Sequence, residues 1–228
     1  DGIRDDLVTG VQTCALPILM THLACADEPG HENTHQQLAV FARLRERLCP
    51  SQCTVVNSAG LLTLPEAHYD WVRPGVMLYG VSPLVGRVGT ELGLRPVAQF
   101  QTSIIELKDL PAGATVGYGA SQRLTRRSRV AIAAAGYGDG YPRAAPPGTP
   151  TWIGEGEAPL LGRVSMDTLA IDVTDRPEAR LGATVVLWGG GLPVESIAAQ
   201  CGTIGYELAC RDRKSTRLNS SHQIISYA

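Results

Sequence analysis

Two short segments of the sequence carry groups that could bind a phosphate. Asn-Ser-Ala-Gly occupies positions 57–60, and Arg-Pro-Gly-Val occupies positions 73–76. The first segment stands where a strand is expected to give way to a helix, a place where a hydroxyl and free backbone N–H groups can hold an anion. In the second, Gly75 lets backbone amides approach a ligand closely. In a βα barrel the loops after the last two strands form the usual phosphate site, so the pair together favours phosphate binding.

Two further residue types could carry chemistry. Of the 20 lysines and arginines, only Lys108 and Lys214 are lysines, so any lysine chemistry must use one of these two. His22 can be a satisfied core histidine or a residue that contacts a ligand, and its residue type alone leaves both readings open.

The elements that must position these residues change character along the chain. Residues 21–93 alternate short apolar runs with helical segments, which is typical of a βα repeat. Strands are predicted at 21–25 and 54–56, and a third unit at 71–80. Apolar side chains recur at helical spacing over 34–48, which predicts an amphipathic helix.

From about position 97 the pattern becomes one of short alternating strands separated by turns, which predicts a separate all-β domain. The predicted strands cover residues 100–107, 130–135 and 169–173. A Gly-Glu-Gly turn at 154–156 predicts a hairpin. A helix at 193–200, opened by a proline, interrupts the β pattern.

Neither end of the chain follows these patterns. Residues 1–20 show neither a helical nor a strand period, and residues 213–228 are polar and rich in serine. We interpret both segments as foreign, adapter-like sequence, with natural flexible tails as the alternative.

Composition excludes several classes of protein. The 228 residues are 44% hydrophobic, enough for a substantial core. A net charge of −2, with both signs interspersed, favours neither nucleic acid nor an anionic membrane as a partner. From this charge balance we expect a small-molecule partner. We find no apolar run of about 20 residues and no basic leader. The six cysteines form no CxxC pair, so we expect reduced thiols, no metal site and a cytoplasmic location.

The order of seven motifs closely resembles that of the alanine racemases. The motifs are His22, Asn-Ser-Ala at 57–59, Val-Arg-Pro-Gly at 72–75 with Met-Leu-Tyr-Gly at 77–80, Val-Gly-Tyr-Gly at 116–119, Gly-Tyr-Gly-Asp-Gly-Tyr at 136–141, Gly-Arg-Val-Ser-Met-Asp at 162–167, and Gly-Tyr-Glu-Leu at 205–208. The resemblance implies an α/β plus all-β fold. The last strands of a pyridoxal-phosphate-binding (β/α)8 TIM barrel would cover residues 21–95, and a C-terminal β-domain would cover residues 96–212.

The resemblance also implies an activity. Alanine racemases interconvert L- and D-alanine with pyridoxal 5′-phosphate as homodimers, and they supply D-alanine for peptidoglycan. Inversion of a stereocentre requires two acid–base groups on opposite faces of Cα, which in this family are a lysine and a tyrosine. Tyr118 matches the tyrosine, which acts on the neighbouring subunit's cofactor, and its flanking glycines would let the loop protrude.

The family's binding residues carry over to matching positions. By the resemblance, the cofactor phosphate is held by Ser58, the backbone of Gly75 and Val76, and Tyr206. Arg73 faces the pyridine nitrogen, and His22 lies beside the ring. The residues that meet the substrate are Tyr118, Tyr137, Met166 and Asp167. Because a guanidinium stays protonated, the pyridine nitrogen that faces Arg73 should stay unprotonated, which limits the cofactor as an electron sink. Ordinary turn and core roles are the alternative for Tyr137, Met166 and Asp167.

One feature of the family is missing. Its Schiff-base lysine stands near the end of the first barrel strand, and neither Lys108 nor Lys214 matches it, so we expect an inactive fragment. Three alternatives stay open: a serine or broad-specificity racemase of the same fold, a basic amino acid decarboxylase, and a non-catalytic dimerisation module. The decarboxylases usually place a carboxylate at the pyridine nitrogen, which disagrees with Arg73.

Overall fold

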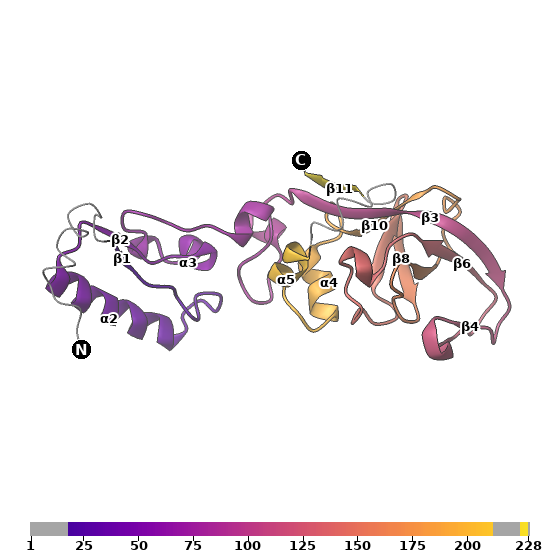
Figure 1. Ribbon diagram of the computed structural model, residues 1–228, viewed down its shortest axis with the longest axis horizontal. Helices are drawn as coiled ribbons and strands as arrows, with labels where there is room; N and C mark the ends of the chain where they lie inside the picture. Colours follow the sequence, from indigo (N-terminus) through magenta and orange to yellow (C-terminus); the bar gives the residue numbers. More distant parts are fainter. Residues whose placement is uncertain (1–17, 212–223, 228) are drawn as a thin grey trace, which may run out of the picture. The chain divides into compact units, whose positions relative to one another are not determined.

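The computed structural model describes residues 18–211 and the strand 224–227 of the 228-residue chain (Figure 1). These residues form two compact units. The first contains the chain up to Leu78 together with Pro83–Arg87, and the second contains Tyr79–Ser82 and the chain from Val88 onward. The two terminal segments interpreted as foreign lie mostly outside the described residues, and so does Lys214.

The first unit is built from parallel βα repeats, as predicted. Strands β1 (Ile18–Met20) and β2 (Gln52–Thr54) pair in parallel, and helix α2 (Glu32–Leu48) connects them. Trp71 forms a parallel bridge with Thr54, so three successive parallel segments lie side by side in chain order. This succession confirms the predicted partial (β/α)8 barrel.

The strand predicted at residues 21–25 is wrong, because β1 ends at Met20. The side chain of Gln37, in α2, takes over the backbone that follows. Its amide nitrogen donates to the carbonyl of His22 at 2.7 Å, and its oxygen accepts from the amide of Ala24 at 3.2 Å. A helix side chain therefore satisfies groups that would otherwise need a neighbouring strand.

The second strand also lies earlier than predicted, at Gln52–Thr54 instead of 54–56. The carbonyls of Val55 and Val56 accept hydrogen bonds from the side chain and the backbone amide of Arg73, at 3.1 and 3.0 Å. Because these two carbonyls accept from Arg73 in the next βα segment, the strand pairing of β2 does not continue past Thr54.

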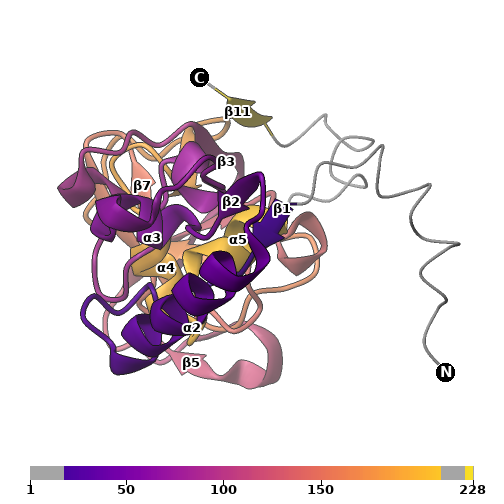
Figure 2. The ribbon, with the colours of Figure 1, turned by 90° about the vertical axis from the view of Figure 1, so that its left-hand side faces the viewer.

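The amphipathic helix predicted at 34–48 is confirmed as α2, which begins two residues earlier because the ring of His31 accepts from the amide of Asn33 at 3.1 Å and caps it. Its buried Phe41 packs into the core of the unit. Figure 2 shows α2 beside the β1–β2 pair. That core contains Leu23, Ala26, Phe41, Cys53, Val55, Val56, Ala59 and Ala67. Helix α3 (Ser58–Thr63) and the short 3-10 helices η1 (Pro65–Ala67) and η2 (Val76–Tyr79) follow.

The second unit is an antiparallel sheet with the strand order β10-β7-β8-β9-β6-β3-β11. Because β10 also pairs with β3, six of these strands close into a ring. The strands are β3 (Ala98–Leu110), β6 (Ser128–Ala133), β7 (Pro150–Ile153), β8 (Gly156–Leu161), β9 (Leu169–Asp172), β10 (Thr184–Trp188) and β11 (Ile224–Tyr227). The predicted β-domain is confirmed, including the 154–156 turn that joins β7 to β8.

The long strand β3 pairs with three neighbours, β10, β6 and β11. Its first half pairs with β10, and from Ile104 onward it pairs with β6 after a register shift between Ile104 and Glu106. Such a bulge bends a strand and lets a sheet close. Inside the ring, Phe100 of β3 packs against Trp188 and Tyr141 at ring-centroid distances of 5.9 and 6.3 Å.

Short helices complete the second unit. They include η3 (Gly89–Leu92) and α4 (Val194–Gln200), which confirms the helix predicted at 193–200. Helix α5 (Gly205–Cys210) was not predicted from the sequence. None of the helices in the described part of the chain has the length and apolar character required to span a bilayer.

Candidate functional site

The guanidinium of Arg73 is held where β1 and β2 end. Its Nη2 donates to the carbonyls of Thr21 (2.7 Å) and Val55 (3.1 Å), and its Nη1 donates to Oγ1 of Thr54 (2.5 Å). Nδ1 of His22 lies 3.5 Å from Nη2. The structure therefore brings together His22 and Arg73, which stand 51 positions apart in the sequence. Because several acceptors share one charged donor, the guanidinium has a fixed direction.

Thr54 is a functional candidate that the sequence analysis did not single out. Only the tertiary structure reveals its bond to Arg73, 19 positions away. No signal in the sequence marked it, because Thr54 was placed at the start of a strand predicted at 54–56. In the structure it ends β2 (Gln52–Thr54), and the sites of βα barrels gather at the carboxyl ends of the strands.

The two predicted phosphate-binding segments meet at Ser58 and Gly75. The amide of Gly75 donates to Oγ of Ser58 at 2.7 Å, and the amide of Met77 lies 3.5 Å from the same oxygen. A Cβ placed on Gly75 would meet nothing closer than this oxygen, at 3.9 Å. The Ser58 hydroxyl thus borders open space beside Gly75, and because it accepts from backbone amides it keeps its own hydrogen for an anion.

Tyr118 lies on a short hairpin of the second unit. Strands β4 (Thr115–Val116) and β5 (Gln122–Arg123) pair in antiparallel fashion, and the 3-10 turn η4 (Tyr118–Ala120) lies between them. The Tyr118 side chain is 70% exposed. Gly117 has φ +83°, and a Cβ there would lie 2.9 Å from the amide nitrogen of Arg163, so the loop can pack this closely only with glycine.

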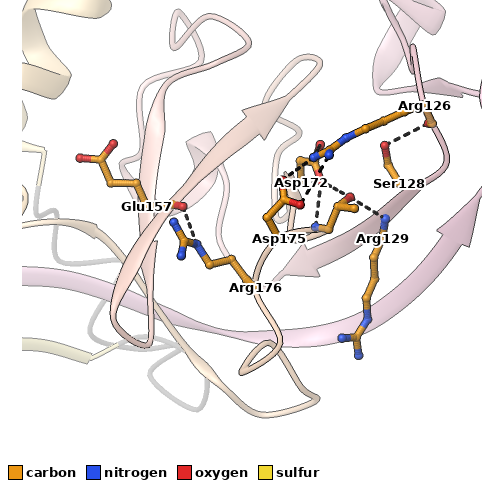
Figure 3. Close-up of polar contacts among 8 residues, drawn as sticks. Arg126, Ser128, Arg129, Glu157, Asp172, Asp175 and Arg176 are labelled. Atoms are coloured by element: carbon orange, nitrogen blue, oxygen red, sulfur yellow. Dashed lines mark hydrogen bonds and ion pairs between the residues drawn. The ribbon is translucent and has the colours of Figure 1, made fainter.

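A polar network fixes the chain shortly after this hairpin (Figure 3). Nη2 of Arg126 lies 2.5 Å from Oδ2 of Asp175, and Oγ1 of Thr174 accepts from the amide of Arg129 at 2.9 Å. Asp172 accepts from the amide of Thr174, also at 2.9 Å. The hydrogen bond and charge of Arg126 hold the pKa of Asp175 below its ordinary value. The start of β6 is thereby tied to the segment that follows β9.

The predicted substrate residues Tyr137, Met166 and Asp167 lie together in the second unit. The amide of Tyr137, in the 3-10 turn η5 (Tyr137–Asp139), donates to the carbonyl of Ser165 at 3.0 Å. The amide of Gly138 donates to the carbonyl of Met166 at 2.8 Å. Met166, Asp167 and Tyr137 are exposed, so they form part of an accessible surface. Arg163, a few residues before Met166, borders the Tyr118 loop.

Tyr206 lies in the first turn of α5, in the second unit, whereas Ser58, Arg73 and Gly75 belong to the first. The preceding Gly205 packs so closely that a Cβ would lie 2.7 Å from Cγ1 of Val81.

Glu195, in α4, fixes the segment that carries Val81. Its Oε1 accepts from the amides of Ser82 (2.7 Å) and Gly89 (2.9 Å), which precede it by 113 and 106 positions. Glu195 could not be predicted from the sequence either, because nothing in the neighbouring residues marks partners so distant.

Parallel βα repeats followed by a closed antiparallel sheet define the class of proteins that join a βα-barrel domain to a β-domain. Within that class, the chain belongs to the alanine racemase family. The model of the alanine racemase C-terminal domain matches residues 97–219, and that of the alanine racemase N-terminal domain matches residues 6–83.

Individual relatives agree with this assignment. An alanine racemase from Stutzerimonas stutzeri (strain A1501) is 51% identical over 190 residues, which cover 83% of this chain and 53% of the relative. The crystal structure of the biosynthetic alanine racemase from Pseudomonas aeruginosa is similar with a TM-score of 0.84 and 42% identity, over 94% of this chain and 62% of that one. A structure from Bartonella henselae, described as an alanine racemase with covalently bound pyridoxal phosphate, has a TM-score of 0.79 and 29% identity. The match covers 86% of this chain and 54% of that one. The chain spans about half the length of the curated relatives it matches.

Proposed function

We propose that this chain supplies part of the active site of an alanine racemase, which interconverts L- and D-alanine with pyridoxal 5′-phosphate and provides D-alanine for peptidoglycan. Family membership and the activity of the named relatives support this proposal. The observation that carries the proposal is the convergence, in one small unit, of the Ser58 hydroxyl with the Gly75 amide and of Arg73 with His22.

The residues of the first unit fit the cofactor. The open space beside Gly75, bordered by the Ser58 hydroxyl, suits a phosphate. In this proposal Ser58, the backbone of Gly75 and Val76, and Tyr206 hold the phosphate. Arg73 and His22 would adjoin the ring, with Arg73 at the pyridine nitrogen. When bound, pyridoxal 5′-phosphate withdraws electrons from Cα of the amino acid, which makes its proton removable.

Tyr118 is the proposed acid–base group on one face of the substrate. Its exposure on a glycine-flanked hairpin suits a residue that is presented to a second copy of the chain. We therefore propose a homodimer in which the Tyr118 phenol of one subunit gives a proton to Cα, or takes one from it, at the other subunit's site. Tyr137, Met166 and Asp167, which are exposed in the same unit as Tyr118, would line the substrate entrance and meet the carboxylate of the substrate.

The second acid–base group would be a lysine that this sequence does not supply. Lys108 lies in β3 and pairs with Glu106, 3.2 Å away, and Lys214 lies outside the described residues. We therefore expect the chain by itself to bind the cofactor without covalent attachment and to leave alanine unchanged.

A chimera tests the proposal. The first half of the S. stutzeri relative, joined to residues 21–212 of this chain, should bind pyridoxal 5′-phosphate and racemise alanine faster than serine. A folded chimera that binds the cofactor but prefers serine would favour the broad-specificity alternative. A folded chimera that racemises neither amino acid would contradict the proposed activity and would favour a non-catalytic module.

A further inference from the structure

Thr54 provides the side-chain oxygen that holds the Arg73 guanidinium. The guanidinium also donates to the carbonyls of Thr21 and Val55, and the ring nitrogen of His22 lies 3.5 Å from Nη2. Nη1 donates to Thr54 Oγ1, whereas both carbonyls accept from Nη2, so Thr54 holds a different nitrogen of the guanidinium from the one that the backbone holds. Bonds from an ionised donor are short and about twice as strong as neutral ones.

The Thr54 hydroxyl can only accept from Arg73, because its one hydrogen is committed elsewhere. Oγ1 donates to the carbonyl of Trp71 at 2.8 Å. A hydroxyl carries one donor hydrogen and two lone pairs, so the lone pairs remain for the guanidinium. Thr54 is 6% exposed and is paired in register with Met20 on one side and Trp71 on the other, which fixes the position of the oxygen.

The three bonds to oxygen leave part of the guanidinium available. A guanidinium has five N–H groups, and Nη2 uses both of its hydrogens on Thr21 and Val55 while Nη1 uses one on Thr54. The N–H of Nε and the second N–H of Nη1 have no acceptor among the described residues, so they remain for a ligand. An arginine without the Thr54 bond could rotate about its last side-chain bonds and present other groups.

We infer that Thr54 is a positioning residue that orients Arg73 toward the cofactor's pyridine nitrogen. The inference rests on the proposed function for the identity of the group that Arg73 faces. The Thr54 hydroxyl itself acts only through Arg73. Its removal should release the guanidinium, weaken cofactor binding and allow the pyridine nitrogen to take up a proton more readily.

Three substitutions in the full 228-residue chain separate orientation from packing. Thr54→Val keeps the shape and removes the hydroxyl, Thr54→Ala removes both, and Thr54→Ser keeps the hydroxyl. Thr63→Val is the matched control, since the Thr63 hydroxyl donates to the carbonyl of Ala59 in the same unit and does not contact Arg73.

The first measurement requires no cofactor: hydrogen exchange of the Arg73 side-chain N–H groups by nuclear magnetic resonance. Exchange should accelerate about tenfold or more in Thr54→Val and Thr54→Ala, and it should stay unchanged in Thr54→Ser and in Thr63→Val. Unchanged exchange in either hydroxyl-free variant would overturn the inference. If Thr54→Val does not fold, the comparison of Thr54→Ala with Thr54→Ser decides.

The second measurement uses pyridoxal 5′-phosphate labelled with ¹⁵N in the ring. In Thr54→Val its affinity should fall about tenfold, and the nitrogen signal should move toward the protonated form, with rescue by Thr54→Ser. Equal affinity and an equal signal in Thr54→Val and the unsubstituted chain would overturn the inference. If the unsubstituted chain binds no cofactor, the proposed function fails for this chain, while the exchange measurement still decides whether Thr54 holds Arg73.

Discussion

The amide of Gly75 donates to the hydroxyl of Ser58 at 2.7 Å, although 17 positions separate them. This bond joins the end of one βα repeat to the next, because Ser58 starts α3 and Gly75 follows the Trp71 bridge. The open space beside Gly75 adjoins the same hydroxyl. The pair therefore provides the local geometry from which the proposed phosphate site follows.

Ser58→Ala should weaken binding of pyridoxal 5′-phosphate to the 228-residue chain about tenfold, because a hydroxyl donor to a charged phosphate is lost. Binding of pyridoxal, which lacks the phosphate, should change little. Titration with both compounds measures the difference, and Ser196→Ala in the second unit serves as the control. An equal loss for the two compounds would show that Ser58 does not act on the phosphate.

Gly136→Ala should destabilise the second unit by about 1–3 kcal/mol or more, because the new methyl group would overlap the carbonyl oxygens of Ser165 and Met166. Gly191→Ala is the matched control, since a Cβ there meets nothing within 4 Å. Urea denaturation of both variants provides the free energies of unfolding. Equal stability of the two variants would contradict the close packing of Gly136.

Glu195→Ala should lower the free energy of unfolding by about 2 kcal/mol, because it leaves the amides of Ser82 and Gly89 without their charged acceptor. Glu195→Gln retains an amide oxygen and should lose roughly 1 kcal/mol. The hairpin-tip variant Glu155→Ala controls for the loss of a carboxylate, and chemical denaturation again provides the measurement. If Glu195→Ala proved as stable as Glu155→Ala, the anchoring role of Glu195 would be wrong.

Tyr141→Phe should raise the free energy of unfolding at neutral pH by about 1 kcal/mol. The Tyr141 side chain is fully buried, and its hydroxyl has no hydrogen-bond partner among the described residues, so it carries a desolvation cost without a compensating bond. A loss of stability in Tyr141→Phe, relative to the exposed control Tyr79→Phe, would reveal a buried partner for the hydroxyl.

The pH dependence of the same variant provides a separate readout. Burial raises the pKa of Tyr141 above its ordinary value near 10. Above about pH 10 the unfolded chain therefore releases a proton that the folded chain retains, so stability falls as pH rises. This decline should be smaller in Tyr141→Phe than in the unsubstituted chain.

The elements with a strong local pattern could be predicted from the sequence. The amphipathic period of α2, the Gly-Glu-Gly turn between β7 and β8, and the change from βα repeats to alternating strands are all properties of neighbouring residues. The strand ends could not be predicted, because Gln37 and Arg73 determine them from other segments.

The candidate site shows the same division. His22, Ser58, Arg73 and Gly75 were predicted from motifs, and the structure brings them together in pairs. Thr54 and Glu195 were missed because their partners lie 19 to 113 positions away in the sequence. The neighbouring sequence does not distinguish a threonine or glutamate that forms such a distant hydrogen bond from one that is exposed to solvent.

The most direct test of the central claim is α-hydrogen exchange in D₂O, measured in the chimera with Tyr118→Phe. The claim predicts that racemisation falls by about 10²–10⁴, the contribution of a positioned acid–base group. One enantiomer should still exchange its α-hydrogen without inversion, through the lysine on the opposite face. Racemisation at the rate of the unsubstituted chimera would contradict the role of Tyr118.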